Sequence, residues 1–196
     1  MEMLIAVGIS LIAMEGFTLL FLRSWDNNKF ILEEGMASSI ASRATNDVVA
    51  TLRSVRQADN GDFPVESGDD FDLKVYIDID DDGVVERVHY FLDLANDQFK
   101  MGVTNPTGAS PVSYPASDDT VTVLANFIVN ENSDPVFYFY NENYPGDTVN
   151  NPLATPVAVE SVRLIRVHLL VNIDPVHAPN NINIESFADL RNLEIL

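Results

Sequence analysis

The residues with the clearest chemical potential in this sequence are closely spaced aspartates that begin at residue 78. They read Asp78-Ile79-Asp80-Asp81-Asp82-Gly83, and Glu86 follows three residues later. Alternate aspartates before a glycine resemble the first half of an EF-hand loop, whose carboxylate oxygens bind calcium. The twelfth position of such a loop holds His89 here, in place of a bidentate glutamate. The pattern therefore allows two interpretations: a calcium site formed by Asp78, Asp80, Asp82 and Glu86, or a solvated acidic hairpin that binds no metal.

The role of Glu86 in such a site depends on the geometry of the loop. It stands at the ninth position of the motif, so it binds a cation directly only if the loop is a hairpin with its own geometry. Further oxygen ligands are available from the preceding turn, at Asp69, Asp70 or Asp72. Calcium is the only cofactor that the sequence indicates.

Little in the sequence indicates catalysis. Of the three histidines, His89 and His168 lie in strand-like patterns and are expected to be sheet residues rather than bases, and His177 lies in a loop. There is no Gly-Xaa-Ser-Xaa-Gly, His-Glu-Xaa-Xaa-His or phosphate-binding loop. Because the chain has no cysteine, thiol nucleophiles, zinc-thiolate sites and disulfides are excluded. We expect a protein that is not an enzyme, and an anchored hydrolase has no motif behind it.

An aromatic run from Phe137 to Tyr140, with Tyr144 nearby, also allows two interpretations. Such rings form a carbohydrate-binding face when they are exposed together. More often an aromatic run is a strand whose alternate rings enter the core.

The charge of the chain is distributed unevenly. Residues through Ala58 include 5 basic and 6 acidic side chains, whereas those from Asp59 onward include 6 basic and 24 acidic ones. The acidic portion would repel DNA, so we expect no nucleic-acid partner. It suits cations, basic partners or solubility in a salty environment.

The N-terminal stretch Met1–Trp25 is apolar and contains two carboxylates, Glu2 and Glu15. As a helix, its first 22 residues would be about 33 Å long, enough for a hydrocarbon core of roughly 30 Å. A signal peptide is disfavoured because no basic residue precedes the apolar run, whereas Arg23 and Lys29 follow it.

Glu2 is the informative residue of this stretch. A carboxylate within an apolar span costs a few kcal/mol and is usually retained for a partner. No Lys or Arg occurs among the first 22 residues. The stretch therefore requires a positive group from another molecule, or a protonated Glu2.

The segment Met1–Ile9 resembles the N-terminal segment of type IV pilins and type II secretion pseudopilins. Met1 and Glu2 then correspond to the fourth and fifth mature residues, and the resemblance implies that Glu2 pairs with the N-terminal amine of a neighbouring subunit. It also implies a filament core formed by apolar residues of this helix: Met3, Leu4, Ile5, Val7, Ile9, Leu11, Ile12, Phe17, Leu19 and Leu20. The stretch Gly16-Phe17-Thr18-Leu19-Leu20 resembles a second processing site, but Phe21 replaces the glutamate and no membrane span would remain.

Two later segments, Ser161–Val167 and Leu190–Leu193, are similar to features of J-type minor pseudopilins. The whole resemblance implies a structural subunit that lies in bacterial inner-membrane lipid before assembly and is processed by prepilin peptidase. Inner-membrane assembly machinery would then build it into an extracytoplasmic or cell-surface filament with other copies of itself, or with other pilins or pseudopilins. The alternative is a membrane-anchored module that binds calcium or a surface and does not polymerise.

The expected architecture is α+β and pilin-like, with one long N-terminal helix packed on a mostly antiparallel sheet. No proline precedes Pro64, so the helix is expected from Met1 to about Ala58, with a bend or interruption at Asp26-Asn27-Asn28. We divide the chain into a transmembrane or filament-core half (1–25), an amphipathic half (26–58) and an acidic β-rich domain (59–196). The apolar face of the amphipathic half is predicted to contain Met36, Ile40, Ala41, Ala44, Val48, Leu52 and Val55.

Alternating apolar residues predict the strands. An Asp-Gly hairpin at residues 80–83 separates the first two, and Gln57–Asp72, Asn141–Pro156 and Asp174–Asn181 are predicted loops. The predicted strands are Phe71–Ile79, Val84–Leu94, a short strand within Asn96–Tyr114, Val121–Val129, Pro135–Tyr140, Val157–Ile173 with a bend near Glu160, and Asn183–Leu193.

Overall fold

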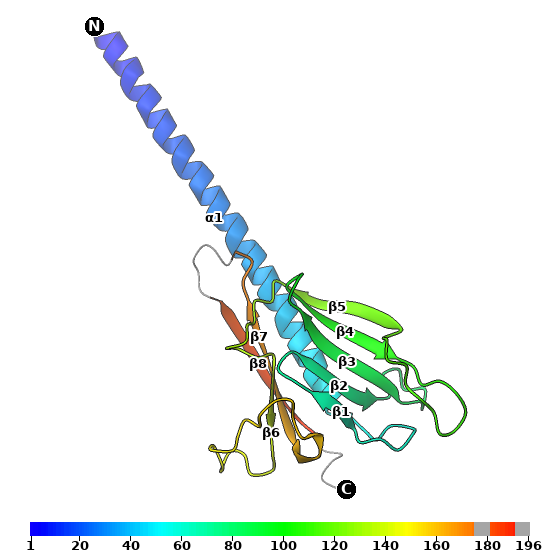
Figure 1. Cartoon of the computed structure of the whole chain (residues 1–196). Coiled ribbons are helices and arrows are strands. Elements are labelled where there is room, and N and C mark those ends of the chain that lie inside the picture. The colour runs from blue at the N-terminus through cyan, green and yellow to red at the C-terminus, as the bar shows by residue number, and fades with distance from the viewer. Residues whose placement is uncertain (175–180, 191–196) are drawn as a thin grey trace. The chain divides into compact units, whose positions relative to one another are not determined.

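The computed structural model describes residues 1–174 and 181–190. Their compact units are residues 1–36 and the described residues from 37 onward. One helix, α1 (Glu2–Leu52), contributes its first part to one unit and its last part to the other (Figure 1). The helix continues through Asp26-Asn27-Asn28, where a bend or interruption was expected. It ends before the predicted Ala58, because the amides of Ser54 and Val55 bond to carbonyls only three residues back and tighten the last turn.

The second unit contains the core, and α1 enters it along one line of small residues. Ala37, Ala41, Ala44, Val48 and Leu52 recur at intervals of three and four, and all are buried. The predicted face was therefore partly wrong, since Met36 is 65% exposed and Ile40 is 48% exposed. Both lie one residue before a buried alanine, about 100° around the helix. The buried alanines belong to the same hydrophobic cluster as apolar residues of both sheets.

Two antiparallel sheets supply the rest of the core (Figure 1). The first has the order β1-β2-β3-β4-β5 and the second the order β6-β7-β8, which confirms an α+β layout with antiparallel pairing. An isolated bridge joins Ile128, just after β5, to Val171, the last residue of β7. The strands are β1 (Val65–Gly68), β2 (Asp72–Ile77), β3 (Glu86–Asp93), β4 (Gln98–Thr104), β5 (Thr120–Asn126), β6 (Phe137–Tyr140), β7 (Leu164–Val171) and β8 (Ile182–Asp189).

Two predictions about the strands were wrong. The predicted loop Gln57–Asp72 contains β1, whose short sequence Val-Glu-Ser-Gly has one apolar residue and forms a strand only because it pairs with β2. Val157–Ile173 is not one strand: the 3₁₀ helix η1 (Val159–Ser161) interrupts it at the expected bend near Glu160, and β7 begins after it. Residues 175–180 of the predicted loop, and 191–193 of the predicted last strand, lie outside the described residues.

Candidate functional site

The first unit presents an apolar helical surface. Every residue assigned to the filament core is exposed, from 84% at Met3 to 55% at Val7 and Leu19. Within the described residues, α1 is the helix whose length and composition would allow it to cross a membrane, a test that signal sequences near an N-terminus also pass. At roughly 25 cal/mol per Å² of apolar surface, such a helix is costly to leave in water. It therefore requires lipid, detergent or other protein.

Two hydroxyl groups within this stretch form hydrogen bonds to the backbone of the same helix. Ser10 Oγ donates to the carbonyl of Ala6 at 2.9 Å, and Thr18 Oγ1 donates to the carbonyl of Met14 at 2.8 Å. Each hydroxyl is thus satisfied within the helix, without water. Glu2 lies in the first turn of α1, where the partial positive charge of the helix N-terminus favours a carboxylate. Its assignment to assembly remains a prediction.

The acidic residues come together at the hairpin between β2 and β3. One ligand atom each from Asp78, Asp80 and Glu86 lies within 4.8 Å of the other two. The turn adopts the backbone that its sequence indicates, with φ of 60° at Asp81 and 93° at Gly83. The hairpin geometry brings Glu86 back beside the start of the loop, as direct ligation from the ninth position requires.

The hydrogen bonds of this cluster leave acceptor capacity free. Asp78 Oδ1 is buried without a hydrogen-bond partner, whereas Asp78 Oδ2 accepts from the amide of Gly83 at 3.1 Å and lies 3.1 Å from Nη2 of Arg56. Glu86 is 3% exposed, and its Oε2 accepts from the amide of Ile79 at 2.9 Å. Burial, together with the charges of Asp80 and Asp82, raises the pKa of Glu86. Oxygen ligands of this kind fit a hard cation such as calcium, although Arg56 already neutralises part of the charge.

The other carboxylates considered as ligands form hydrogen bonds with other groups. Asp82 Oδ1 accepts from the amide of Val84 at 2.8 Å, and Asp82 is not part of the cluster of converging carboxylates. Asp69 Oδ1 accepts from the amide of Asp70, whose own Oδ1 accepts from the hydroxyl of Thr155. Asp72 pairs with His89. Of the four predicted ligands, Asp78, Asp80 and Glu86 converge in the structure and Asp82 does not.

His89 belongs to a charged network that the sequence did not reveal. It is a sheet residue on β3, as expected, but both ring nitrogens contact carboxylates, from Asp72 and Asp118. These residues lie 17 and 29 positions from His89 in sequence, so no local spacing could have indicated the arrangement. With both nitrogens engaged, His89 has none left to act as a general base on a substrate.

The aromatic run is mainly structural. Phe137 and Phe139 are buried in the core, as the strand interpretation predicts. Tyr140 is buried as well, with 4% of its surface exposed. Tyr138 is partly covered by Arg166, whose guanidinium carbon lies 3.8 Å from the ring centroid. An exposed platform formed by the whole run is therefore absent, since three of its four rings are buried and the fourth is stacked.

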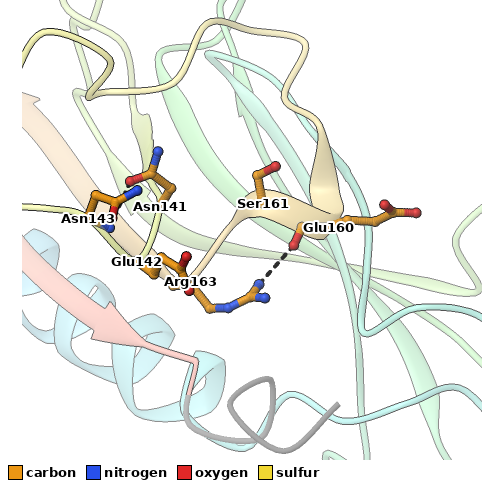
Figure 2. A pocket seen from close by; sticks show the side chains of 6 residues that line it. All are labelled: Asn141, Glu142, Asn143, Glu160, Ser161 and Arg163. Atoms are coloured by element: carbon orange, nitrogen blue, oxygen red, sulfur yellow. Dashed lines mark hydrogen bonds between the residues drawn. The ribbon is translucent and has the colours of Figure 1, made fainter. Parts of the chain in front are cut away.

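A polar pocket of about 320 Å³ lies among the loops after β6 and around η1 (Figure 2). Its lining residues are Asn141, Glu142, Asn143, Glu160, Ser161 and Arg163. Arg163 Nη1 donates hydrogen bonds to the carbonyl of Glu160 at 2.9 Å and to the carbonyl of Val162 at 2.8 Å. The lining side chains are thus two amides, two carboxylates, one hydroxyl and one guanidinium.

The structure thus combines an exposed apolar N-terminal helix with an α+β unit, an arrangement compatible with a pilin-like fold. Comparisons of the chain with protein-family models, with curated proteins and with solved structures found no match.

Proposed function

We propose that this protein is a structural subunit of a filament of the type IV pilus or type II secretion pseudopilus kind. The observation that carries the proposal is the exposure of the large apolar side chains between Met3 and Leu22, which are attached in sequence to a unit with its own core. Membrane lipid would cover this surface before assembly. Helices of other subunits would cover it afterwards. Both environments keep the same apolar area out of water, so the helix can pass from lipid to filament without exposing it.

Glu2 is the residue that we propose to direct docking. Within an apolar filament core, its carboxylate would be stabilised by the N-terminal amine of a neighbouring subunit, since no Lys or Arg occurs in the first 22 residues. Such a pair would set the axial register of the helices, because a mispaired carboxylate would lie unneutralised in an apolar environment.

The test compares Glu2→Ala with Glu15→Ala in cells that assemble the filament. Glu15 is the matched control, because it is the other carboxylate of the first 22 residues and has no docking role in this proposal. We expect Glu2→Ala to abolish or strongly reduce filaments in electron micrographs, with the subunit still in the membrane and its second unit folded. Glu15→Ala should retain filaments. Normal filaments from the Glu2 variant would contradict the docking role.

Density traced through native filaments would define the kind of subunit. If the chain fits every position, with Glu2 buried beside a neighbouring N-terminus, the protein is a main filament subunit. If it occurs only at a tip, or in a small complex with other pseudopilins, it is a minor subunit that initiates assembly. Its absence from filaments and from such complexes would reject the proposal.

A second candidate function is a membrane-anchored module that binds calcium and does not polymerise. The observation in its favour is the convergence of Asp78, Asp80 and Glu86 at the hairpin, with a buried oxygen of Asp78 that has no hydrogen-bond partner. Calcium binding with no filament would favour this candidate, whereas calcium binding within filaments would make the cation part of the first proposal.

A further inference from the structure

His89 lies between two carboxylates that come from different parts of the second unit. Its Nε2 is 2.6 Å from Oδ2 of Asp72 on β2, and its Nδ1 is 2.9 Å from Oδ2 of Asp118. Asp118 belongs to residues 105–119, the segment that connects β4 to β5 and that we call the strap. The side chains of His89 and Asp118 are only 16% and 12% exposed, so water replaces these contacts poorly.

The protonation state of His89 follows from its two partners. Ionised carboxylates only accept hydrogen bonds, and a neutral imidazole has one N–H to donate. Only the imidazolium form can therefore donate to Asp72 and Asp118 at once. The ring of Phe91 is stacked on His89 with centroids 4.5 Å apart, and an aromatic face also favours a cation.

The backbone is shaped to receive Asp118 at this place. Gly102 on β4 is the register partner of His89, and a Cβ added to Gly102 would lie 2.1 Å from Oδ2 of Asp118. A glycine is thus required for the carboxylate to reach the imidazole. Thr104 Oγ1 donates to the other oxygen, Asp118 Oδ1, at 3.2 Å.

The strap has further attachments that do not depend on His89. Arg87 Nη2 donates to the carbonyl of Pro115 at 2.5 Å, and the hydroxyl of Tyr114 donates to the carbonyl of Val85 at 2.8 Å. Next to Asp118, the amide of Asp119 donates to the carbonyl of Val103 at 2.9 Å, so this bond belongs to the end of the strap that the contact with His89 holds. Loss of the contact to His89 would therefore loosen one end of the strap and leave the rest attached.

We propose that Asp72, His89 and Asp118 form a pH-sensitive clasp, which holds the Asp118 end of the strap on the first sheet and loosens it when His89 loses its proton. The proposal does not depend on the filament function. The charged groups linked to this site come from three strands and the strap: Asp72 and Lys74 on β2, Arg87 on β3, Glu66 on β1 through its pairing with Arg87, and Asp118. Nη2 of the Arg87 guanidinium lies 3.8 Å from Asp118 Oδ1, so it limits the movement of the released carboxylate.

The pH range of the clasp follows from the direction of two pKa shifts. Burial lowers the pKa of His89, but the hydrogen bonds from Asp72 and Asp118 outweigh it, and the pKa lies above its usual 6.5. Burial likewise raises the pKa of Asp72, and the bond to His89 outweighs this effect, so the pKa lies below 3.8. The contribution of these two ionised groups to the stability of the folded state is therefore complete between pH 3.8 and 6.5. It is lost as pH rises through the raised pKa of His89, and as pH falls through the lowered pKa of Asp72.

Hydrogen exchange of the full chain in detergent micelles tests the clasp. Protection factors corrected for the intrinsic pH dependence of exchange would be compared at about pH 5.5 and about pH 9, on either side of a raised histidine pKa. We expect the Asp119 amide to lose about tenfold or more of its protection at the higher pH. The amide of Val167 on β7, in the other sheet, is the internal control and should keep its protection.

Two variants separate the clasp from a general effect of pH. His89→Gln removes the titrating group, so the protection of Asp119 should become equal at the two pH values. Gly102→Ala displaces Asp118 without a change of charge, so protection should be low at both. A pH dependence that persists in His89→Gln would overturn the proposal. So would a His89 pKa at or below 6.5 in an NMR titration of the unmodified chain, a measurement that requires no variant to fold.

Discussion

Gly68 on β1 lies against the ring of Phe139 on β6. A Cβ at residue 68 would be 2.6 Å from Cζ of Phe139 and 2.9 Å from Cγ1 of Val157. The amide of Val157 also donates to the carbonyl of Gly68 at 2.9 Å. The edge of the first sheet thus meets the second sheet where the chain has no side chain, which is how glycine in a strand permits close approach.

This contact predicts that Gly68→Ala destabilises the second unit. The added methyl group would displace an aromatic ring within the core, at a cost of about 1–3 kcal/mol of unfolding free energy. Chemical denaturation followed by circular dichroism measures the effect. Ser67→Ala is the matched control on the adjacent residue, and it should change the stability by less than about 0.5 kcal/mol. Equal unfolding free energies for the two variants would contradict the prediction, because they would show that the core accommodates the methyl group without cost.

The acidic hairpin predicts a difference between neighbouring aspartates in calcium binding. Asp80 belongs to the converging cluster, whereas Asp81 does not. We expect Asp80→Asn to weaken binding by tenfold or more, which corresponds to about 1.4 kcal/mol, and Asp81→Asn to have little effect. Titration calorimetry of the full chain in detergent would measure the two affinities. Asn tolerates the positive φ of Asp81, so this control should fold normally.

The unmodified chain gives the decisive control for calcium. Binding to the folded state alone raises its stability by about 2.7 kcal/mol at 100 times the dissociation constant. If millimolar calcium produces neither heat nor a shift of the melting temperature, the hairpin is an acidic turn without a metal. Equal losses in Asp80→Asn and Asp81→Asn would indicate a diffuse effect of charge rather than a site.

The chain contains one tryptophan, Trp25, which reports on the environment of the first unit. Trp25 is 63% exposed, and its ring lies 6.3 Å from that of Phe21. We expect its fluorescence emission to shift to shorter wavelength, and quenching by acrylamide to fall, when the protein enters lipid vesicles or filaments. Tryptophan favours the membrane interface, which explains the expected shift. A Trp25→Phe variant supplies the background signal. Emission typical of tryptophan in water, measured in the presence of lipid, would contradict membrane insertion of this stretch.

Several features of the fold could be predicted because they depend on residues close in sequence. The absence of proline before Pro64 predicted the long helix, and Asp82-Gly83 predicted the hairpin between β2 and β3. The strand β1 was missed because its four residues have little apolar character and depend on β2 for pairing. The predicted apolar face was right where Ala41, Ala44, Val48, Leu52 and Val55 are buried. It was wrong at Met36 and Ile40, which are exposed although they are larger and more apolar than the buried alanines beside them.

The candidate sites divide in the same way. The sequence by itself determined the apolar N-terminal helix with Glu2, the excess of acid beyond Ala58 and the cluster of aspartates at the hairpin, because composition and short spacing carry this information. Only the tertiary structure decided which carboxylates converge. Asp82 bonds to the amide of Val84, whereas Glu86 lies beside Asp78. It alone placed Asp72, His89 and Asp118 in contact, since strand pairing and the path of the strap bring together residues that are distant in sequence.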